Sequence, residues 1–284
     1  MNIANLKIDS KKCIGCGLCT KVCPNNLLFL NSHKKASHLP ISEFGWNGCW
    51  KCQHCLAVCP KGAVSVLKKN PEDSLLPFDV EITSKVMDSL VVNRRSHRRY
   101  IRKNVEPSLI EHILAILQNA PNGGNKEQVE YTLINDVDQM DYIRNLAYKR
   151  MEELAEKGIY AEGFDEKSYN DLKRAESSVR PDMLFCGVPH LLIPHAPIGK
   201  GCWKQDTDIA CAYFELLCNA HGLGTALMSY CVDVLNLMID VKELLNIPDT
   251  HYIGMAIGFG YPEIKYARGV QKESELKLDI KKFI

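Results

Sequence analysis

The chain has 284 residues, of which 46% are hydrophobic and 24% are charged, and its formal net charge is +1. These values are typical of a globular protein with one large and one small domain, and a charge so close to zero argues against a nucleic-acid or membrane-surface role for the whole chain. No apolar run approaches the roughly 20 residues of a transmembrane helix. The first residues lack the apolar core of a signal peptide, so we expect a cytoplasmic protein without a membrane partner.

The first 70 residues contain eight of the 13 cysteines, in two copies of the spacing C-x-x-C-x-x-C-x-x-x-C-P. Three cysteines at this spacing can bind three irons of one [4Fe–4S] cluster. The fourth cysteine, before the proline, ligates the other cluster in two-cluster ferredoxins. The predicted ligand sets are Cys13, Cys16, Cys19 and Cys59 for the first cluster, and Cys49, Cys52, Cys55 and Cys23 for the second.

Zinc and disulfides are the other common uses of grouped cysteines. Zinc sites usually contain two C-x-x-C pairs or mixtures of histidine and cysteine, and disulfides need an oxidising compartment. The doubled run of four therefore favours clusters, and a pair of clusters indicates a protein that moves single electrons. Trp46 and Trp50 flank the start of the second run, and we expect them to shield its cluster from solvent.

An internal repeat organises this part of the chain. Short apolar segments at 6–9, 27–30 and 63–67 precede or follow the cysteine runs, and we predict a pseudo-two-fold ferredoxin fold built around the clusters. A polar stretch with a proline follows and is typical of a linker. We therefore divide the chain into a ferredoxin domain at 1–70, a linker at 71–80 and a second domain at 81–284.

The second domain mixes helical and strand patterns. Pro107 suits the first position of a helix, and Gly222 suits the end of a strongly apolar one. The patterns do not alternate as βαβ units, which favours an α+β fold over a dinucleotide-binding fold. The predicted helices span 82–92, 107–117, 138–157 and 206–221, and the predicted strands span 131–134, 190–193 and 253–258.

A basic run at 93–103 contains five arginines and one lysine. Composition alone leaves three interpretations open: a solvated helix end, a nucleic-acid patch, or a site for the phosphate of a cofactor. A cluster domain needs an electron acceptor, and a flavin accepts single electrons and delivers pairs. The context therefore favours a flavin phosphate.

Four motifs in this domain follow one another as they do in a known family. They are RRSHRRY at 94–100, APNGGN at 120–125, HGLGT at 221–225, and GFGYP at 258–262 with an arginine at 268. Through them, residues 85–270 resemble the FMN-dependent nitroreductase family, and the whole chain resembles its ferredoxin-fused members. The resemblance implies an FMN domain with a mixed sheet flanked by helices, and a homodimer with each FMN at the subunit interface.

The resemblance assigns the phosphate end of FMN to the basic run. Arg94, Ser96 and Arg268 are expected to hold the phosphate, and Arg95 to contact the phosphate or the ribityl chain. Arg98 is expected near N1 and the C2 carbonyl of the ring, where a fixed positive charge favours the anionic reduced flavin.

Other residues are assigned to the ring. Asn125 is expected to hydrogen-bond the ring edge, and the backbone around Met228, Ser229 and Tyr230 is expected to lie near N5. Where the family has x-Q-P-W after the asparagine, this chain has Lys-Glu-Gln-Val at 126–129, so it lacks a proline and an aromatic residue there.

The remaining cysteines and the histidines show no metal-site spacing. Cys211 and Cys218 lie on one face of a predicted helix and are expected to be buried, whereas Cys202 is a candidate exposed thiol. His190 and His195, beside a predicted strand, are expected to have structural roles.

Three hypotheses follow. In the first, the protein is a redox enzyme that passes electrons from two [4Fe–4S] clusters to FMN and on to a small acceptor such as a nitroaromatic, a quinone or an activated alkene. Its donor is a ferredoxin-like carrier or NAD(P)H. In the second, it is an electron-transfer module for a partner protein and has no small-molecule substrate. In the third, which the near-neutral charge disfavours, the basic run binds nucleic acid.

Overall fold

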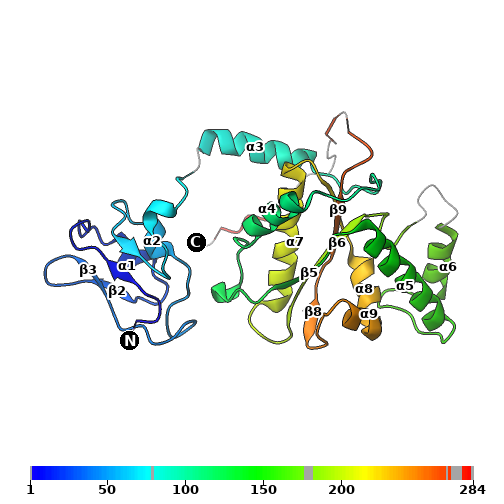
Figure 1. Ribbon diagram of the computed structural model, residues 1–284, viewed down its shortest axis with the longest axis horizontal. Helices are drawn as coiled ribbons and strands as arrows, with labels where there is room; N and C mark the ends of the chain where they lie inside the picture. Colours follow the sequence, from blue (N-terminus) through cyan, green and yellow to red (C-terminus); the bar gives the residue numbers. More distant parts are fainter. Residues whose placement is uncertain (1, 78–79, 176–181, 267, 270–276, 283–284) are drawn as a thin grey trace.

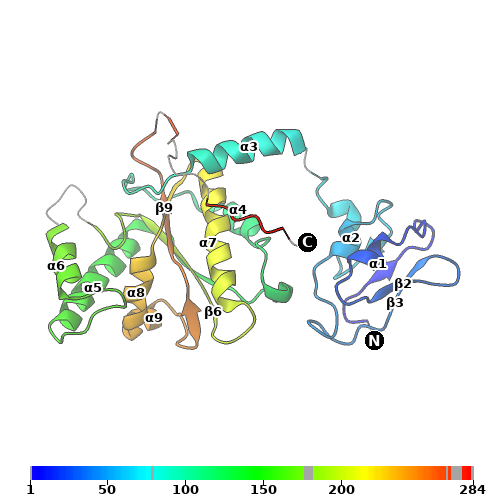
Figure 2. The same cartoon turned by 180° about the vertical axis from the view of Figure 1, so that it is seen from behind.

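The computed structural model describes residues 2–77, 80–175, 182–266, 268–269 and 277–282. Figure 1 shows a small N-terminal lobe beside a larger lobe, with α3 (Val80–Asn93) running from the junction along the larger lobe. Figure 2 shows the same arrangement from behind. The boundaries at residues 70 and 80 stay predictions, although α3 begins at the second of them.

The small lobe contains two antiparallel ribbons and two short helices. β1 pairs with β4, which joins the start of the lobe to its end, and β2 pairs with β3. Its core contains Leu28, Leu56 and Val64 together with the thiols of Cys13 and Cys19. The elements are β1 (Lys7–Ile8), α1 (Leu18–Val22), β2 (Leu28–Leu30), β3 (Ala36–His38), α2 (His54–Ala57) and β4 (Val64–Ser65), followed by the 3-10 turn η1 (Pro71–Asp73).

The larger lobe is built on a five-stranded sheet with the order β5-β6-β9-β7, and β8 also pairs with β6. The ladders described for this sheet are antiparallel, and a parallel bridge from Ser96 to Thr225 adds the basic run beside β7. The strands are β5 (Glu130–Ile134), β6 (His190–Pro197), β7 (Gly224–Leu227), β8 (His251–Ile253) and β9 (Ile257–Gly260).

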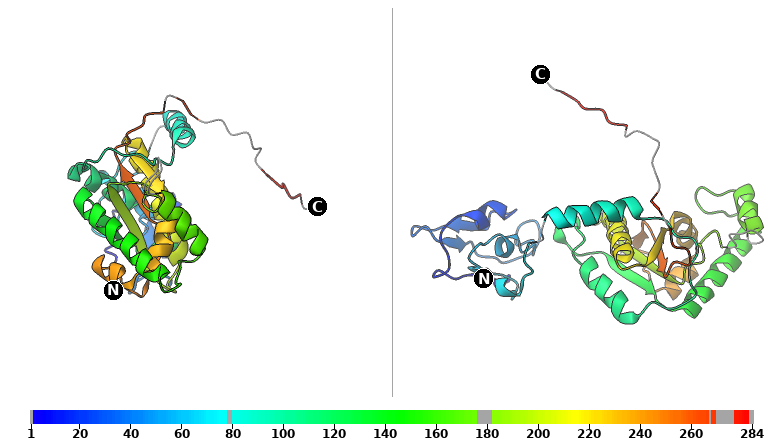
Figure 3. Two further views of the ribbon diagram at one scale, coloured as in Figure 1. Left: turned by 90° about the vertical axis from the view of Figure 1, so that its right-hand side faces the viewer. Right: turned by 90° about the horizontal axis from the view of Figure 1, so that it is seen from above.

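Helices cover both faces of this sheet. One face packs on α4 and α7 through residues such as Leu192, Phe214 and Phe259, and the other packs on α5, α8 and α9 through residues such as Ile193 and Leu235. Figure 3 shows these layers and the segment 277–282, which extends away from both lobes. The helices are α4 (Pro107–Leu117), α5 (Val137–Ala155), α6 (Glu166–Ala175), α7 (Trp203–Ala220), α8 (Ser229–Leu237) and α9 (Ile239–Leu244), with a 3-10 turn η2 (Gly123–Asn125).

Most of the predicted elements of this lobe are confirmed, and the helix predicted at 107–117 coincides with α4. The single strand predicted at 253–258 is wrong, because the chain breaks between β8 and β9. A Cβ atom at Gly254 would lie 2.4 Å from Oγ1 of Thr207, so the chain approaches α7 closely at the break. The helices α6, α8 and α9 and the strand β7 were not predicted.

Among the described residues, no helix is both long and apolar enough to cross a membrane.

Candidate cofactor sites

The two cysteine runs share left-handed backbone at two equivalent positions. Gly15 and Gly17 have φ values of 72° and 74°, and the equivalent positions of the second run, Lys51 and Gln53, have 56° and 58°. The left-handed region is easily reached by glycine and is strained for other residues. The second run therefore keeps this conformation at a cost, as expected if ligand geometry requires it.

The runs bring the two predicted ligand sets to two separate cavities. One cavity, of about 420 Å³, is lined by Cys23, Cys49, Cys52 and Cys55, and Trp50 also contacts it. The other, of about 340 Å³, is lined by Cys13, Cys16, Cys19 and Cys59. Each cavity thus receives three cysteines from one run and the fourth from the other.

The surroundings of the sulfurs disfavour thiolates in the absence of a bound metal. Burial raises the pKa of the Cys19 thiol, and among the neighbouring thiols Cys59 from the other run raises this pKa the most. Burial raises the pKa of Cys55 to about 12, and Cys52 adds to the rise. Four sulfurs so close together need positive iron to be held as thiolates, and binding would release their protons.

The fourth cysteine of each run accepts an equivalent backbone hydrogen bond. The N–H of Leu27 donates to Sγ of Cys23 at 3.3 Å, and the N–H of Ala63 donates to Sγ of Cys59 at 3.2 Å. Hydrogen bonds to cluster sulfurs are one of the means by which proteins tune reduction potential.

The two tryptophans have different environments. Trp50 lines the second cavity, whereas Trp46 packs edge-on against Trp50 and is 65% exposed. Shielding of that cavity is therefore carried mainly by Trp50.

The small lobe contacts the larger lobe next to this cavity. Nδ2 of Asn125 donates to the backbone oxygen of Trp50 at 3.1 Å, and Lys51 forms an ion pair with Glu127 at 3.4 Å. An open cavity of about 1040 Å³ lies at this junction and is lined by Phe44, Gly45, Trp50, Lys51, Gly124, Asn125, Lys126, Gln128, Gly199, Lys200 and Gly201.

The arginine motif at 94–100 contacts the C-terminal half of α7, whereas the loop that contains Asn125 contacts its first turn. The motif also forms a hydrogen bond with β7. The N–H of His97 donates to the carbonyl of Thr225 at 2.8 Å, and Nη1 of Arg94 donates to Glu215 at 3.1 Å. The hydroxyl of Thr225 contacts the same carboxylate at 3.5 Å and accepts from Asn219 at 2.9 Å. Arg94 is thus paired with a buried acidic side chain that the sequence analysis did not identify.

Arg95 has the donors that a phosphate needs. Its Nη1 donates to the carbonyls of Val92 and Arg94, while Nε and Nη2 are buried and have no hydrogen-bond partner. Buried guanidinium nitrogens without partners are costly, and two oxygens of one phosphate would accept a hydrogen bond from each of them. This orphaned pair fits the phosphate end of FMN.

The chain next to Arg268 comes close to this guanidinium. A Cβ atom placed on Gly269, next to Arg268, would lie 3.6 Å from Nη2 of Arg95, and the ring of Tyr266 lies 5.6 Å from that of His97. The segment that includes Arg268 therefore returns to the arginine motif, and Arg268 itself is exposed there.

Arg98 is separate from these contacts. It is exposed, donates to the carbonyl of Ser96 at 3.3 Å, and lines a cavity of about 420 Å³ together with Arg99, Tyr100, Asp182 and Glu263. Burial raises the pKa of the Tyr100 hydroxyl, which keeps it protonated.

The residues assigned to the flavin ring lie in two places. Met228 is buried and its N–H donates to the carbonyl of Ala256 at 2.9 Å, while Ser229 and Tyr230 begin α8 and are exposed. Asn125 lies at the lobe junction, where the neighbouring Gly123 N–H donates to Asp206 in the first turn of α7.

The two ends of the candidate FMN site are therefore well separated in one chain. Asp206, beside the Asn125 loop, and Glu215, beside Arg94, lie nine residues apart on α7, which is about 13 Å along the helix. The structure brings together Arg94, Arg95, Ser96 and the segment of Arg268, and it leaves Asn125 apart from them.

The two parts of the chain match two known families. Residues 91–261 match the nitroreductase family, and residues 12–63 match the 4Fe-4S dicluster domain. The first match covers more than half of the chain, so the chain belongs to the nitroreductase family. The protein is accordingly an oxidoreductase with an electron-transfer function, and its two domains imply FMN and two [4Fe–4S] clusters.

Solved structures show the same fold. A nitroreductase with bound FMN from Bacteroides fragilis has a TM-score of 0.55 at 16% identity, over 72% of this chain and 100% of that one. A nitroreductase with bound FMN from Desulfitobacterium hafniense has a TM-score of 0.53 at 16% identity, over 68% and 97%. An FMN- and NADPH-dependent nitroreductase from sphigopyxis sp. strain HMH has a TM-score of 0.50 at 18% identity, over 69% and 99%.

Two curated proteins of Methanocaldococcus jannaschii share only a short region with the chain. An uncharacterised protein is 36% identical over 64 residues, and this region is 22% of that protein. An uncharacterised ferredoxin is 29% identical over 65 residues, which is 80% of its length. The chain thus spans about a fifth of the first relative and most of the second.

Proposed function

We propose that the protein is a flavoenzyme in which electrons pass from two [4Fe–4S] clusters to FMN and then to a small acceptor such as a nitroaromatic, a quinone or an activated alkene. When bound, FMN accepts electrons singly and delivers them in pairs. A ferredoxin-like carrier is the proposed donor. NAD(P)H is the other, since a similar nitroreductase is described as NADPH-dependent.

In the small lobe, the crossed cysteine sets are proposed to hold the clusters. Cys13, Cys16, Cys19 and Cys59 would bind the first, and Cys49, Cys52, Cys55 and Cys23 the second. The lining of the two cavities supports this assignment.

In the larger lobe, Arg95 is proposed to bind the FMN phosphate with its two orphaned nitrogens, helped by Ser96 and Arg268. Arg94 contributes charge while Glu215 fixes its position. Arg98 is proposed to stabilise negative charge at the ring, and Asn125 with the backbone around Met228, Ser229 and Tyr230 is proposed to orient the ring.

The observation that carries the proposal is the contact between the lobes. The second cysteine cavity is lined by Trp50, and the backbone oxygen of Trp50 accepts the hydrogen bond of Asn125. The residue assigned to the flavin edge and the residue that covers a cluster are thus in direct contact. A short route between the two cofactors is what electron transfer requires.

A second copy of the chain is proposed to complete each FMN site. The ring-edge residue Asn125 lies at one end of α7 and the phosphate residues lie nearer the other, and the resemblance to FMN-dependent nitroreductases suggests that each FMN lies at the interface of a homodimer. The helix α3 has no buried residue, and apolar side chains such as Val86 and Val91 are 63% and 53% exposed. This apolar surface supports α3 as part of the dimer contact.

The enzyme proposal is tested by mixing the anaerobically reduced holoprotein with a nitroaromatic and following flavin absorbance. Reoxidation faster than that of free reduced FMN, with formation of the reduced product, supports an enzyme. Reoxidation no faster than that of free FMN contradicts the proposal for this substrate class and favours an electron-transfer module for a partner protein.

A further inference from the structure

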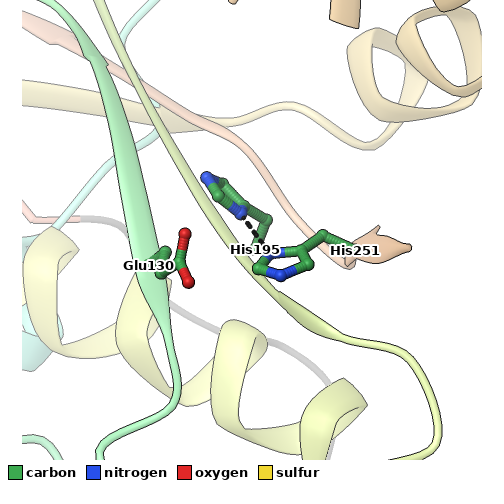
Figure 4. A group of neighbouring side chains, drawn as sticks. All are labelled: Glu130, His195 and His251. Atoms are coloured by element: carbon green, nitrogen blue, oxygen red, sulfur yellow. Dashed lines mark hydrogen bonds between the residues drawn. The ribbon is translucent and has the colours of Figure 1, made fainter. Parts of the chain in front are cut away.

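Two buried histidines and a glutamate meet on one face of the sheet, and none of them lines the cavities described above. Glu130 of β5 is paired in register with His195 of β6, and His251 of β8 is paired with Pro197, two residues further along β6. The three side chains therefore lie on the same face. Figure 4 shows the imidazoles in contact and the carboxylate beside them, and their potential ligand atoms all lie within 4.8 Å of one another.

Hydrogen bonds fix the direction of the His195 ring. The hydroxyl of Thr132 contacts the carbonyl of Leu245 at 3.4 Å, and its oxygen lies 3.1 Å from Nε2 of His195. A hydroxyl that donates to a carbonyl can accept from an imidazole N–H, and this favours the tautomer of His195 that carries its hydrogen on Nε2. The lone pair of His195 is then on Nδ1, which faces Nδ1 of His251 at 2.8 Å.

This is the arrangement found around metal-bound histidines. Such a histidine usually donates its second ring N–H to an oxygen that fixes its orientation, as His195 does to Thr132. Two nitrogens bound to one tetrahedral ion at about 2.0–2.1 Å each are separated by about 3.3–3.4 Å. The two Nδ1 atoms are 2.8 Å apart, so they would separate by about half an ångström to bind one ion.

One positive and one negative side chain act on the histidine pair. Lys242 of α9 is 7% exposed and opposes a cation, while the carboxylate of Glu130 favours one. Lys242 itself lies 3.8 Å from Asp249. Burial lowers the pKa of His195 to about 4, with His251 adding to the effect, so the imidazole that metals require is the neutral form present at pH 7.

We propose that Glu130, His195 and His251 bind one divalent transition-metal ion, with zinc as the natural candidate for two nitrogens and one carboxylate oxygen. Binding replaces the hydrogen that lies between the two Nδ1 atoms, which moves through solvent to Nε2 of His251, so both imidazoles stay neutral and no oxidation state changes. The ion would cross-link β5, β6 and β8, and a water molecule would complete its coordination.

The test is metal analysis of the holoprotein purified anaerobically with both clusters and FMN in place. After incubation with zinc and dialysis against metal-free buffer, we expect one zinc per chain with no loss of cluster iron. Iron must be counted in the same sample, because cysteines released from a damaged cluster would also bind zinc. Zinc should also raise the melting temperature, because it binds only the folded site.

Variants distinguish zinc binding at this site from non-specific zinc binding to other histidines. Glu130→Gln and His251→Gln should remove the zinc and its effect on melting. Thr132→Val should weaken zinc binding by roughly 10- to 100-fold, because it removes only the acceptor that orients His195. His112→Asn is the matched control, since His112 and His221 form an exposed pair with ring centroids 5.2 Å apart, compared with 5.1 Å for His195 and His251.

Zinc bound equally by the wild type and by the Glu130 and His251 variants would overturn the proposal, as would loss of zinc in the His112 variant. Absence of zinc in the wild type with its full iron content would also overturn it, and the two histidines would then share only a proton. None of these outcomes bears on flavin reduction.

Discussion

Arg95 tests the candidate phosphate site at the level of one side chain. Its Nε and Nη2 are buried without partners. Arg95→Ala should weaken FMN binding by about 10- to 100-fold, which corresponds to the roughly 1.5–3 kcal/mol of a hydrogen bond to a charged group. Titration of deflavinated protein with FMN, followed by fluorescence, measures the change.

Arg102→Ala is the matched control from the same basic run. Arg102 is exposed and forms ion pairs at 2.7 Å with Asp138 and with Asp141, so its guanidinium already has partners, unlike Nε and Nη2 of Arg95. We expect its removal to leave FMN affinity unchanged. Equal losses in the two variants would show that general positive charge, rather than the Arg95 site, holds the cofactor.

The thiols of the larger lobe are expected to differ in their reactivity at pH 8. Burial raises the pKa of Cys211, Cys218 and Cys231, whereas Cys202 is exposed. In the folded protein at pH 8, iodoacetamide should modify Cys202 and spare the three buried thiols, because only thiolates react. Mass spectrometry before and after unfolding measures each site.

The same shifts set the direction of a stability change. The pKa of each buried thiol is higher in the folded state than in the unfolded state. The contribution of the thiol to the free energy of unfolding is therefore complete below the unfolded pKa of about 8.5 and is lost as pH rises above that value. Each thiol can cost up to about 1.4 kcal/mol per pH unit there. The melting temperature should fall from pH 8 to pH 10, and less so in Cys218→Ala. An identical fall in that variant would contradict this origin.

At the scale of elements, β7 positions the arginine motif. A Cβ atom at Gly224 would lie 2.7 Å from Cγ of His97, which is too close for the ring to stay in place. Gly224→Ala should therefore displace the basic run and weaken FMN binding, at a cost of about 1–3 kcal/mol for overpacking. The double variant Gly224→Ala with His97→Ala should recover much of the affinity, as measured by FMN titration. No recovery would mean that His97 is not the obstacle.

Elements with strong local signals were predictable. The helix at 107–117 has a proline at its start and a clear apolar face, and it coincides with α4. The break between β8 and β9 was not predictable, because it depends on the close approach of Gly254 to α7, a contact between distant parts of the chain.

In the candidate sites, too, the features with local sequence signals were predictable, and those that depend on distant contacts were not. The cysteine spacing alone predicted which four thiols line each cavity, because the repeat is local. The pairing of Arg94 with Glu215, and the separation of Asn125 from the arginines, depend on the length and position of α7. His195 was expected to have only a structural role, and no spacing links it to His251, which lies 56 residues away.

For the whole molecule, the proposed dimer contact can be tested on α3. Val86→Glu places a charge on the exposed apolar surface of this helix and should shift the protein from dimer to monomer with loss of FMN. Lys85→Ala, on the same helix, should change neither property. Analytical ultracentrifugation with flavin counting measures both. A wild-type monomer that retains FMN would contradict the proposal that a second chain completes the site.

The central claim is that electrons reach FMN through the clusters. It is tested by rapid anaerobic mixing of oxidised holoprotein with a reduced bacterial ferredoxin, with cluster and flavin absorbance followed together. We predict rapid flavin bleaching in the wild type and, in a Cys55→Ser variant that retains FMN but lacks the second cluster, bleaching no faster than that of free FMN. Flavin reduction at the wild-type rate in that variant would contradict the account.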